Sequence, residues 1–216
     1  FSLKPGRFLC EPLALCSDID FHHEHQLQIA GVAGYDAGEV TAVFTPNTVG
    51  TQYGAAIVPQ DTGTTGDVAF FTRGLLSSLN APGGAIGDVA TFEMMLDGDT
   101  ALVPGQVLAP LAARTTTGNS SVLTMTGPTA SQRLYAALHI TASSGATPSV
   151  TVTVQSSTVV GMTSPTTRFT FAAATGTGWQ FATPLAGAIT DGFYRATFTI
   201  SGVTPSFTAA VFLGVL

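Results

Sequence analysis

The amino-acid sequence predicts an all-β protein, and three of its features lead to that prediction. Thr alternates with Val, Phe or Ala over many short segments, and this period of two suits a pleated strand with one buried face. The 24 Gly and 12 Pro residues punctuate those segments as turn residues do. Helical periodicity is scarce. At 216 residues the chain is long enough for one large β domain or two domains of about 100 residues.

The clearest strand pattern lies in the C-terminal half, where the sequence predicts two β-hairpins built alike. The first spans residues 134–155 and the second spans residues 193–213. Their predicted turns are Ser-Gly-Ala-Thr-Pro-Ser at 144–149 and Ser-Gly-Val-Thr-Pro-Ser at 201–206. Gly supplies a positive φ and Pro stiffens the return, so we interpret each segment as a hairpin loop.

A polar segment divides the predicted strands into two groups. Residues 1–26 are interpreted as an N-terminal arm, and residues 27–113 as a first domain of β-strands. In that domain, residues 73–80 fit either one or two helical turns or a strand. The polar residues 114–121 form the predicted linker. The predicted C-terminal domain, 122–216, holds about seven strands in about 95 residues, a density that suits an antiparallel β-sandwich.

Charge is scarce and unevenly distributed. Charged residues make up 9% of the chain, whereas a soluble domain usually has about 25%, so we expect much of the surface to be covered by copies of the chain or by a partner. Residues 1–99 hold three basic and twelve acidic residues, a net charge of −9. Residues 100–216 hold four basic residues and one acidic residue, a net charge of +3. An acidic domain repels the DNA backbone, so we expect no tight or sequence-specific DNA binding.

Two groups of residues resemble metal or redox sites, but the sequence favours neither. His22, His23, Glu24 and His25 are adjacent, and a strand would place only two of these ligands on each face, so a solvated or interfacial segment is the favoured interpretation. Cys10 and Cys16 could close a short disulfide loop, although two free thiols are favoured. No metal or cofactor is therefore expected. No signal peptide is recognisable, and no apolar run reaches the roughly 18 residues of a membrane span.

The sequence also does not predict an enzyme. Gly-Asp-Val-Ala occurs at 66–69 and again at 87–90, and Asp before a strand commonly caps a turn, so turn chemistry is favoured over carboxylate catalysis. His139 lies in an alternating segment, where we expect a core or hydrogen-bonded histidine. The serines lie in predicted turns, and the nucleophile motif Gly-x-Ser-x-Gly does not occur.

A series of short motifs resembles phage virion structural proteins, specifically the tail-tube (major tail protein) type. The resemblance spans about three quarters of the chain. Its motifs are structural and bring no catalytic signature. They are Gly-Asp-Val-Ala at 66–69, Gly-Asp-Val-Ala-Thr-Phe at 87–92, Leu-Val-Pro-Gly-Gln-Val-Leu at 102–108, Arg-Leu-Tyr-Ala-Ala-Leu-His-Ile at 133–140, Ser-Pro-Thr-Thr-Arg-Phe-Thr-Phe at 164–171, Thr-Asp-Gly-Phe-Tyr-Arg at 190–195, and Ser-Gly-Val-Thr-Pro-Ser-Phe-Thr at 201–208.

The resemblance implies a structural role in the virion. The first domain would be a β-barrel subunit of tail-tube type that joins its neighbours edge to edge into a ring, and stacked rings would form a tube through which DNA passes. The second domain would be an outer sandwich, and the partners would be the chain itself and other virion proteins. Like charge on a lumen lets DNA slide without sticking. We therefore expect some of the following acids to line the lumen: Asp61, Asp67, Asp88, Glu93, Asp97 and Asp99.

Two other functions stay open at this point. Capsid decoration or cement proteins, which are usually trimeric, use similar β modules and would bind a shell instead of stacking along an axis. A carbohydrate-binding sandwich for host attachment would need exposed aromatic side chains. The candidates for that role are Trp179, Tyr135, Tyr194 and Tyr35, although we expect Trp179 and the tyrosines to fill the core instead.

Overall fold

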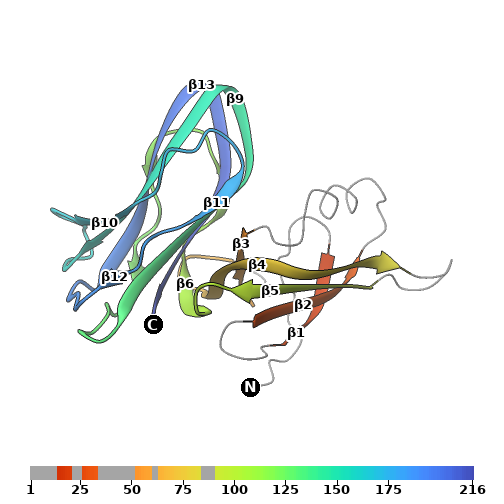
Figure 1. Ribbon diagram of the computed structural model, residues 1–216. Helices are drawn as coiled ribbons and strands as arrows, with labels where there is room; N and C mark the ends of the chain where they lie inside the picture. Colours follow the sequence, from red (N-terminus) through yellow and green to blue (C-terminus); the bar gives the residue numbers. More distant parts are fainter. Residues whose placement is uncertain (1–13, 21–25, 34–51, 60–62, 84–90) are drawn as a thin grey trace. The chain divides into compact units, whose positions relative to one another are not determined.

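The computed structural model describes residues 14–20, 26–33, 52–59, 63–83 and 91–216, and within these ranges every regular element is a β-strand (Figure 1). The prediction of an all-β protein is confirmed, and the strand pairs whose registers are resolved are all antiparallel. The chain separates into two compact units. The first comprises residues 1–61 and 70–102, and the second comprises 62–69 and 103–216.

The first unit contains a five-stranded antiparallel sheet. Its strands are paired in the order β1-β2-β5-β4-β3. The described part of the predicted arm includes β1, which pairs with β2 and so belongs to this sheet. The strands are β1 (Ala14–Asp20), β2 (Gln26–Ala33), β3 (Gln52–Ile57), β4 (Val68–Gly83) and β5 (Thr91–Gly98), with β4 beginning in the second unit.

Strand β4 decides one ambiguity of the sequence. Residues 73–80, which fit helical turns or a strand, are part of β4 and pair with β5. At Gly74 the two backbones approach so closely that a Cβ would lie 2.6 Å from the carbonyl oxygen of Asp97. Glycine is therefore required at this position. Leu76 and Leu96 are paired across the same two strands, and both are buried.

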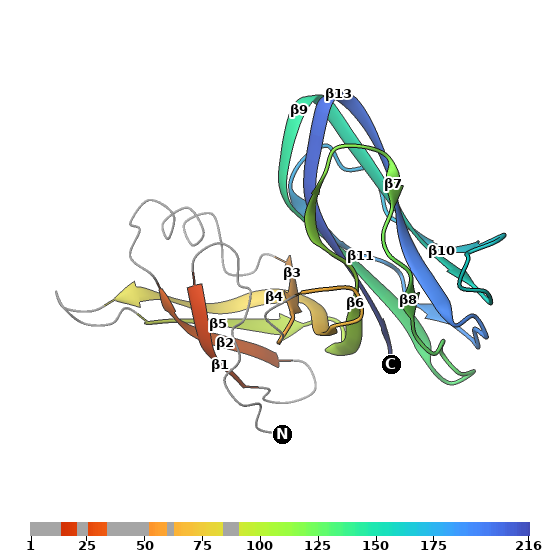
Figure 2. The same cartoon turned by 180° about the vertical axis from the view of Figure 1, so that it is seen from behind.

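The second unit contains the remaining strands, organised by its two longest. Strands β9 and β13 have 25 and 23 residues and pair with each other along almost their whole length. Figures 1 and 2 show this two-stranded ribbon folding over at one end. The strands are β6 (Val103–Arg114), β7 (Gly118–Asn119), β8 (Leu123–Thr124), β9 (Arg133–Ser157), β10 (Thr166–Thr170), β11 (Gly178–Phe181), β12 (Leu185–Ala186) and β13 (Phe193–Val215).

The two predicted hairpins are wrong in their pairing. The repeated Gly-x-Thr-Pro segments lie where β9 and β13 bend without ending, and Gly145 and Gly202 take the positive φ values of 112° and 122°. A Cβ on Gly145 would lie 2.7 Å from the carbonyl oxygen of Thr204, so each bend packs directly on the other. The N-terminal half of β9 consequently pairs with the C-terminal half of β13, and the C-terminal half of β9 with the N-terminal half of β13.

The folded ribbon forms the centre of two facing layers. In the first layer β6 pairs with the β13 side of the ribbon, and β11 and β12 pair one after the other with the β9 side. In the second layer the flanking strands are β7 and β8 on one side and β10 on the other. When β11 with β12, and β7 with β8, are each counted as one position, both layers have four positions. This order, with a long ribbon folded across both layers, is that of a jelly roll.

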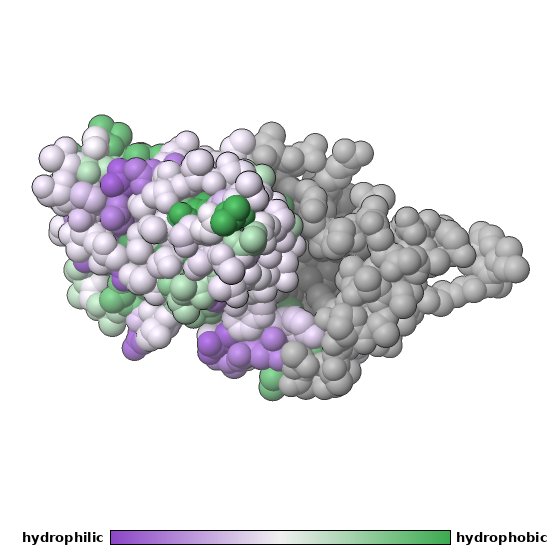
Figure 3. Space-filling view, turned by 90° about the horizontal axis from the view of Figure 1, so that it is seen from above, coloured by the Kyte–Doolittle hydropathy of each residue, from purple (hydrophilic) through white to green (hydrophobic). Residues whose placement is uncertain are grey.

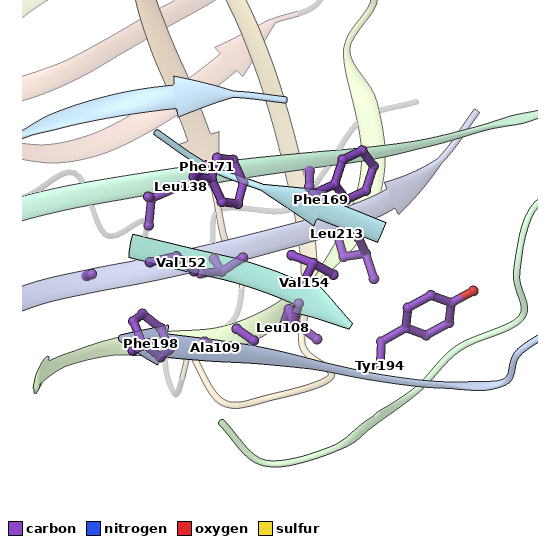
Figure 4. Close-up of a cluster of buried hydrophobic side chains, with 14 of the residues drawn as sticks. Leu108, Ala109, Leu138, Val152, Val154, Phe169, Phe171, Tyr194, Phe198 and Leu213 are labelled. Carbon is purple, nitrogen blue, oxygen red and sulfur yellow. The ribbon is translucent and has the colours of Figure 1, made fainter. Parts of the chain in front are cut away.

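One hydrophobic core lies between the two layers (Figure 4). Alternate residues of each half-strand point into it, for example Leu138 from the first layer and Val152 and Phe198 from the second. Each buried side chain of this size stabilises the fold by about 1.5–3 kcal/mol. Among the described residues the largest fully buried side chain is Tyr194, whose hydroxyl donates a hydrogen bond to the carbonyl oxygen of Asp191 at 3.2 Å.

The unit boundary differs from the predicted one. Strand β6 pairs with β13 from Gly105 to Arg114, and β7 pairs with it at Gly118 and Asn119, so the predicted linker 114–121 lies inside the second unit. Residues 66 and 67 also join that unit through hydrogen bonds with Val107, each 2.9 Å long. The predicted first domain, 27–113, is therefore shared between the two units.

Candidate functional site

The surface of the second unit carries very little charge. Residues 63–69 and 103–216, all of which are described, contain only six charged residues, and only Arg133 among them is exposed. Figure 3 shows a face on which intermediate, pale colours predominate over strongly hydrophilic ones. The exposed residues are instead largely Thr, Ser, Ala and Gly. The six charged residues are Asp67, Arg114, Arg133, Arg168, Asp191 and Arg195.

Two of these charges are neutralised inside a polar cluster at the edge of the core. The guanidinium of Arg168 donates to the carboxylate of Asp191 at 2.8 Å and to the hydroxyl of Ser156 at 2.7 Å. The Ser156 hydroxyl donates in turn to Asp191 at 2.5 Å. These hydrogen bonds, from Ser156 and then Arg168, lower the pKa of Asp191 below its ordinary value. Burial raises the pKa of the neighbouring Tyr194 to about 12. The hydrogen bonds of this cluster join β9, β10 and the turn before β13.

The outer face of the second layer is polar but uncharged apart from one arginine. Arg195 donates to the side-chain oxygen of Gln155 at 2.9 Å. Thr197 lies 3.2 Å from the same oxygen and 2.8 Å from the side-chain oxygen of Asn119. Thr197 also pairs across the ribbon with Thr153. This face therefore offers hydroxyl and amide groups already hydrogen-bonded to one another.

The outer face of the first layer is aromatic. Trp179 on β11 pairs with His139 on β9, and both lie on the side opposite the core residue Leu138. The ring of His139 meets Phe212 edge to face, with centroids 5.7 Å apart. Tyr135 and Phe181 make a similar contact at 6.3 Å. We call these five residues the aromatic face.

Burial on the aromatic face determines the charge state of its histidine. Desolvation lowers the pKa of His139 from its ordinary 6.5 to about 4. The imidazole is therefore neutral at physiological pH and packs as an aromatic ring against Phe212. The sequence predicted a core or hydrogen-bonded histidine, whereas the structure packs His139 among aromatic rings on the side of the sheet opposite the core.

The structure separates the aromatic residues that the sequence grouped as carbohydrate-binding candidates. Tyr194 lies in the core, as the alternative interpretation predicted. Trp179 and Tyr135 are half-buried on the aromatic face instead of filling the core. Tyr35 lies outside the described residues. The sequence could not make this distinction, because facing inward or outward depends on the strand register.

The predicted lumen acids are distributed over both units. Asp97 and Asp99 are exposed in the first unit, and Asp99 pairs with Arg73 at 2.9 Å and accepts a hydrogen bond from Gln52 at 2.6 Å. Glu93 lies on β5 in the first unit. Asp67, in the second unit, accepts hydrogen bonds from the amide and hydroxyl of Thr64 at 2.6 and 3.1 Å, which confirms the predicted turn chemistry. Asp61 and Asp88 lie outside the described residues.

The remaining sequence candidates lie mostly where the structure describes nothing. The histidine cluster at 22–25 and Cys10 are outside the described residues, while Cys16 lies on β1 opposite Gly31. In the described part of the chain, no group of three His, Cys, Asp or Glu side chains is arranged to hold a metal ion. The same part contains no helix long and apolar enough to cross a bilayer.

Arg114 is a feature that the sequence did not reveal. Its guanidinium carbon lies 4.1 Å from the centroid of the Phe198 ring, and one terminal nitrogen donates to the carbonyl oxygen of Pro110 at 3.2 Å. Its Nε is buried and has no hydrogen-bond acceptor among the residues that the structure describes. Burial lowers the pKa of this side chain below its ordinary value. Arg114 is thus a partly desolvated cation stacked on the edge of the core.

Comparison with known proteins leaves the chain without an assigned family. No family matches it, and no curated protein matches it. Among solved structures, it is similar to the insecticidal delta-endotoxin Cry8Ea1 from Bacillus thuringiensis, with 9% sequence identity and a TM-score of 0.31. The match covers 100% of this chain and 54% of the toxin chain, so this chain spans about half the length of that protein. A similarity this weak carries no argument about fold or function.

Proposed function

We propose that the chain is a structural virion protein that self-assembles into stacked rings and forms a phage tail tube for DNA passage. The observation that carries the self-assembly is the near absence of exposed charge on the second unit, where only Arg133 is exposed among its described charged residues. A free monomer of this size normally relies on a surface with roughly 25–35% charged residues for solubility. A subunit whose surface is covered by neighbouring copies in an assembly does not need this surface charge.

The first unit supports the ring-forming part of the proposal. Its sheet ends in β1 on one side and β3 on the other, and among the described residues neither strand has a second strand partner. Open edges are sites at which another chain can add, and a ring closes them by joining each subunit to the next. The acidic character of residues 1–99 would keep a DNA-filled lumen from binding its cargo.

Electron microscopy of the purified full-length chain tests this function directly. We expect rings or tubes with a central channel, and a reconstruction should place Asp97 and Asp99 on the channel wall. Sedimentation should show assemblies that grow with protein concentration. A chain that remains monomeric at high concentration would refute self-assembly. Assemblies with no channel, or trimers that bind only to capsids, would instead support the decoration or cement function.

The aromatic face favours a second candidate, carbohydrate binding for host attachment. Trp179 is half-buried on the outer side of a sheet, with Tyr135 and Phe181 on the same face. Sugar rings stack on such aromatic surfaces, since one face of a pyranose is apolar. A glycan array probed with the full-length chain distinguishes this candidate. Binding that is lost in Trp179→Ala would support it, and an array without binding would reject it.

A further inference from the structure

The C-terminal end of β6 carries a run of exposed apolar residues. Leu111, Ala112 and Ala113 are exposed one after another, although they follow three consecutive buried residues on the same strand. Three consecutive exposed apolar residues are uncommon unless they serve a function. In the strand order β6 lies between β4 and β13, and the residues just before β4, Gly66 and Asp67, hydrogen-bond with β6 at Val107. Leu111, Ala112 and Ala113 lie beyond that point and present exposed apolar side chains at the end of β6.

The local backbone of this segment of β6 does not allow another strand simply to pair with it. The register with β13 shifts between Ala109 and Ala112, so β6 carries one extra residue at Pro110 and Leu111. Proline has no N–H to donate, and the bulge interrupts the regular spacing of backbone groups. The end of β6 consequently offers side chains to a partner instead of a backbone ladder.

Arg114 lies in the same segment, and its positive charge is only partly solvated. Its guanidinium is partly desolvated over Phe198, and its Nε has no acceptor in the described part of the chain. A desolvated cation is most stable beside an anion, and a planar guanidinium is best matched by a carboxylate. No carboxylate pairs with Arg114 within the described residues.

The chain itself carries carboxylates in excess, but in its other half. Twelve of the thirteen acidic residues lie in residues 1–99, while residues 100–216 carry a net charge of +3. Asp97 and Asp99 are examples that are exposed in the first unit. Such opposite charges on one chain suit a head-to-tail contact between copies, in which two different surfaces meet.

We propose that Leu111–Arg114 is a docking patch for the acidic N-terminal part of a second copy of the chain. A carboxylate of the neighbouring copy pairs with the Arg114 guanidinium, and apolar atoms of that copy cover Leu111 and the two alanines. The contact joins unlike surfaces, so repetition closes a ring or extends a stack. This inference rests on the proposed self-assembly and specifies one of its interfaces.

Sedimentation of the full-length chain and three variants tests the patch. Arg114→Gln removes the cation, Leu111→Ser removes apolar area, and Arg133→Gln is the matched control because it removes an exposed positive charge elsewhere. We expect Arg114→Gln and Leu111→Ser each to weaken association more than tenfold. Arg133→Gln should change it less than about twofold. The wild-type association should weaken as salt rises, and Arg114→Gln should flatten that dependence.

The outcomes separate the patch from the assembly itself. If wild type assembles and all three variants assemble equally well, the patch is refuted while the proposed function stands. If wild type remains monomeric, both are refuted. If Arg114→Gln lowers the thermal stability of the dilute monomer without weakening association, the carboxylate belongs to the same chain and the patch is refuted. Circular dichroism verifies that each variant is folded, and Leu111→Ser decides the result if Arg114→Gln does not fold.

Discussion

Replacing His139 with phenylalanine should remove a specific part of the protein's acid sensitivity. His139 packs edge to face on Phe212, and burial lowers its pKa from 6.5 to about 4. The folded state therefore binds this proton less readily than the unfolded state. The stability that the neutral imidazole provides is complete above pH 6.5 and is lost as the pH falls towards 4.

The size of this effect follows from the two pKa values. A shift from 6.5 to about 4, at about 1.4 kcal/mol per pKa unit, corresponds to about 3 kcal/mol when the titration is complete. At pH 4.5, between these values, about 2.5 kcal/mol should already be lost. Most carboxylates titrate at lower pH, so this loss can be separated from theirs.

Urea unfolding followed by far-UV circular dichroism measures the effect between about pH 7.5 and pH 4.5. Wild type should lose about 2.5 kcal/mol more than His139→Phe over that interval. Trp179→Phe is the matched control, because Trp179 pairs with His139 across the strands but does not titrate. The control should retain the wild-type pH dependence. Equal pH dependence in wild type and His139→Phe would refute the argument that burial keeps this imidazole neutral.

Two further substitutions test the polar cluster and the ribbon bend. Asp191→Asn keeps the shape of the side chain but leaves Arg168 without its carboxylate. The free energy of unfolding should therefore fall by about 2–3 kcal/mol at pH 7. A loss below about 0.5 kcal/mol in urea titrations would contradict a structural role for the cluster. Gly145→Ala places a Cβ 2.7 Å from the carbonyl oxygen of Thr204 at a residue with positive φ, so stability should fall by more than about 2 kcal/mol. Gly176→Ala, where nothing lies within 4 Å of the added Cβ, should change stability by less than about 1 kcal/mol, and equal losses in the two alanine variants would mean that the bend is not closely packed.

The candidate sites were only partly accessible to sequence reasoning. The turn role of Asp67 follows from its position before a strand, which is a local property. The polar cluster is non-local, because Ser156 and Asp191 are 35 residues apart in the sequence. Neither segment contains a pattern that predicts contact with the other. The same holds for Arg114, which meets Phe198 only because both strands border the same core. Side-chain partners of this kind depend on which strands become neighbours.

The sequence by itself determined that this chain is all-β, where its two Gly-x-Thr-Pro segments turn the backbone, and how its charge is divided. These properties are local or compositional: alternation sets strand faces, and Gly145 and Gly202 allow a positive φ wherever their segments lie. Only the tertiary structure decided that the two similar segments form one folded ribbon instead of two hairpins. Both arrangements satisfy the same turn residues and the same alternation. Pairing β9 with β13 along their length buries both inner faces in a single core, and that gain appears only when the whole unit is assembled.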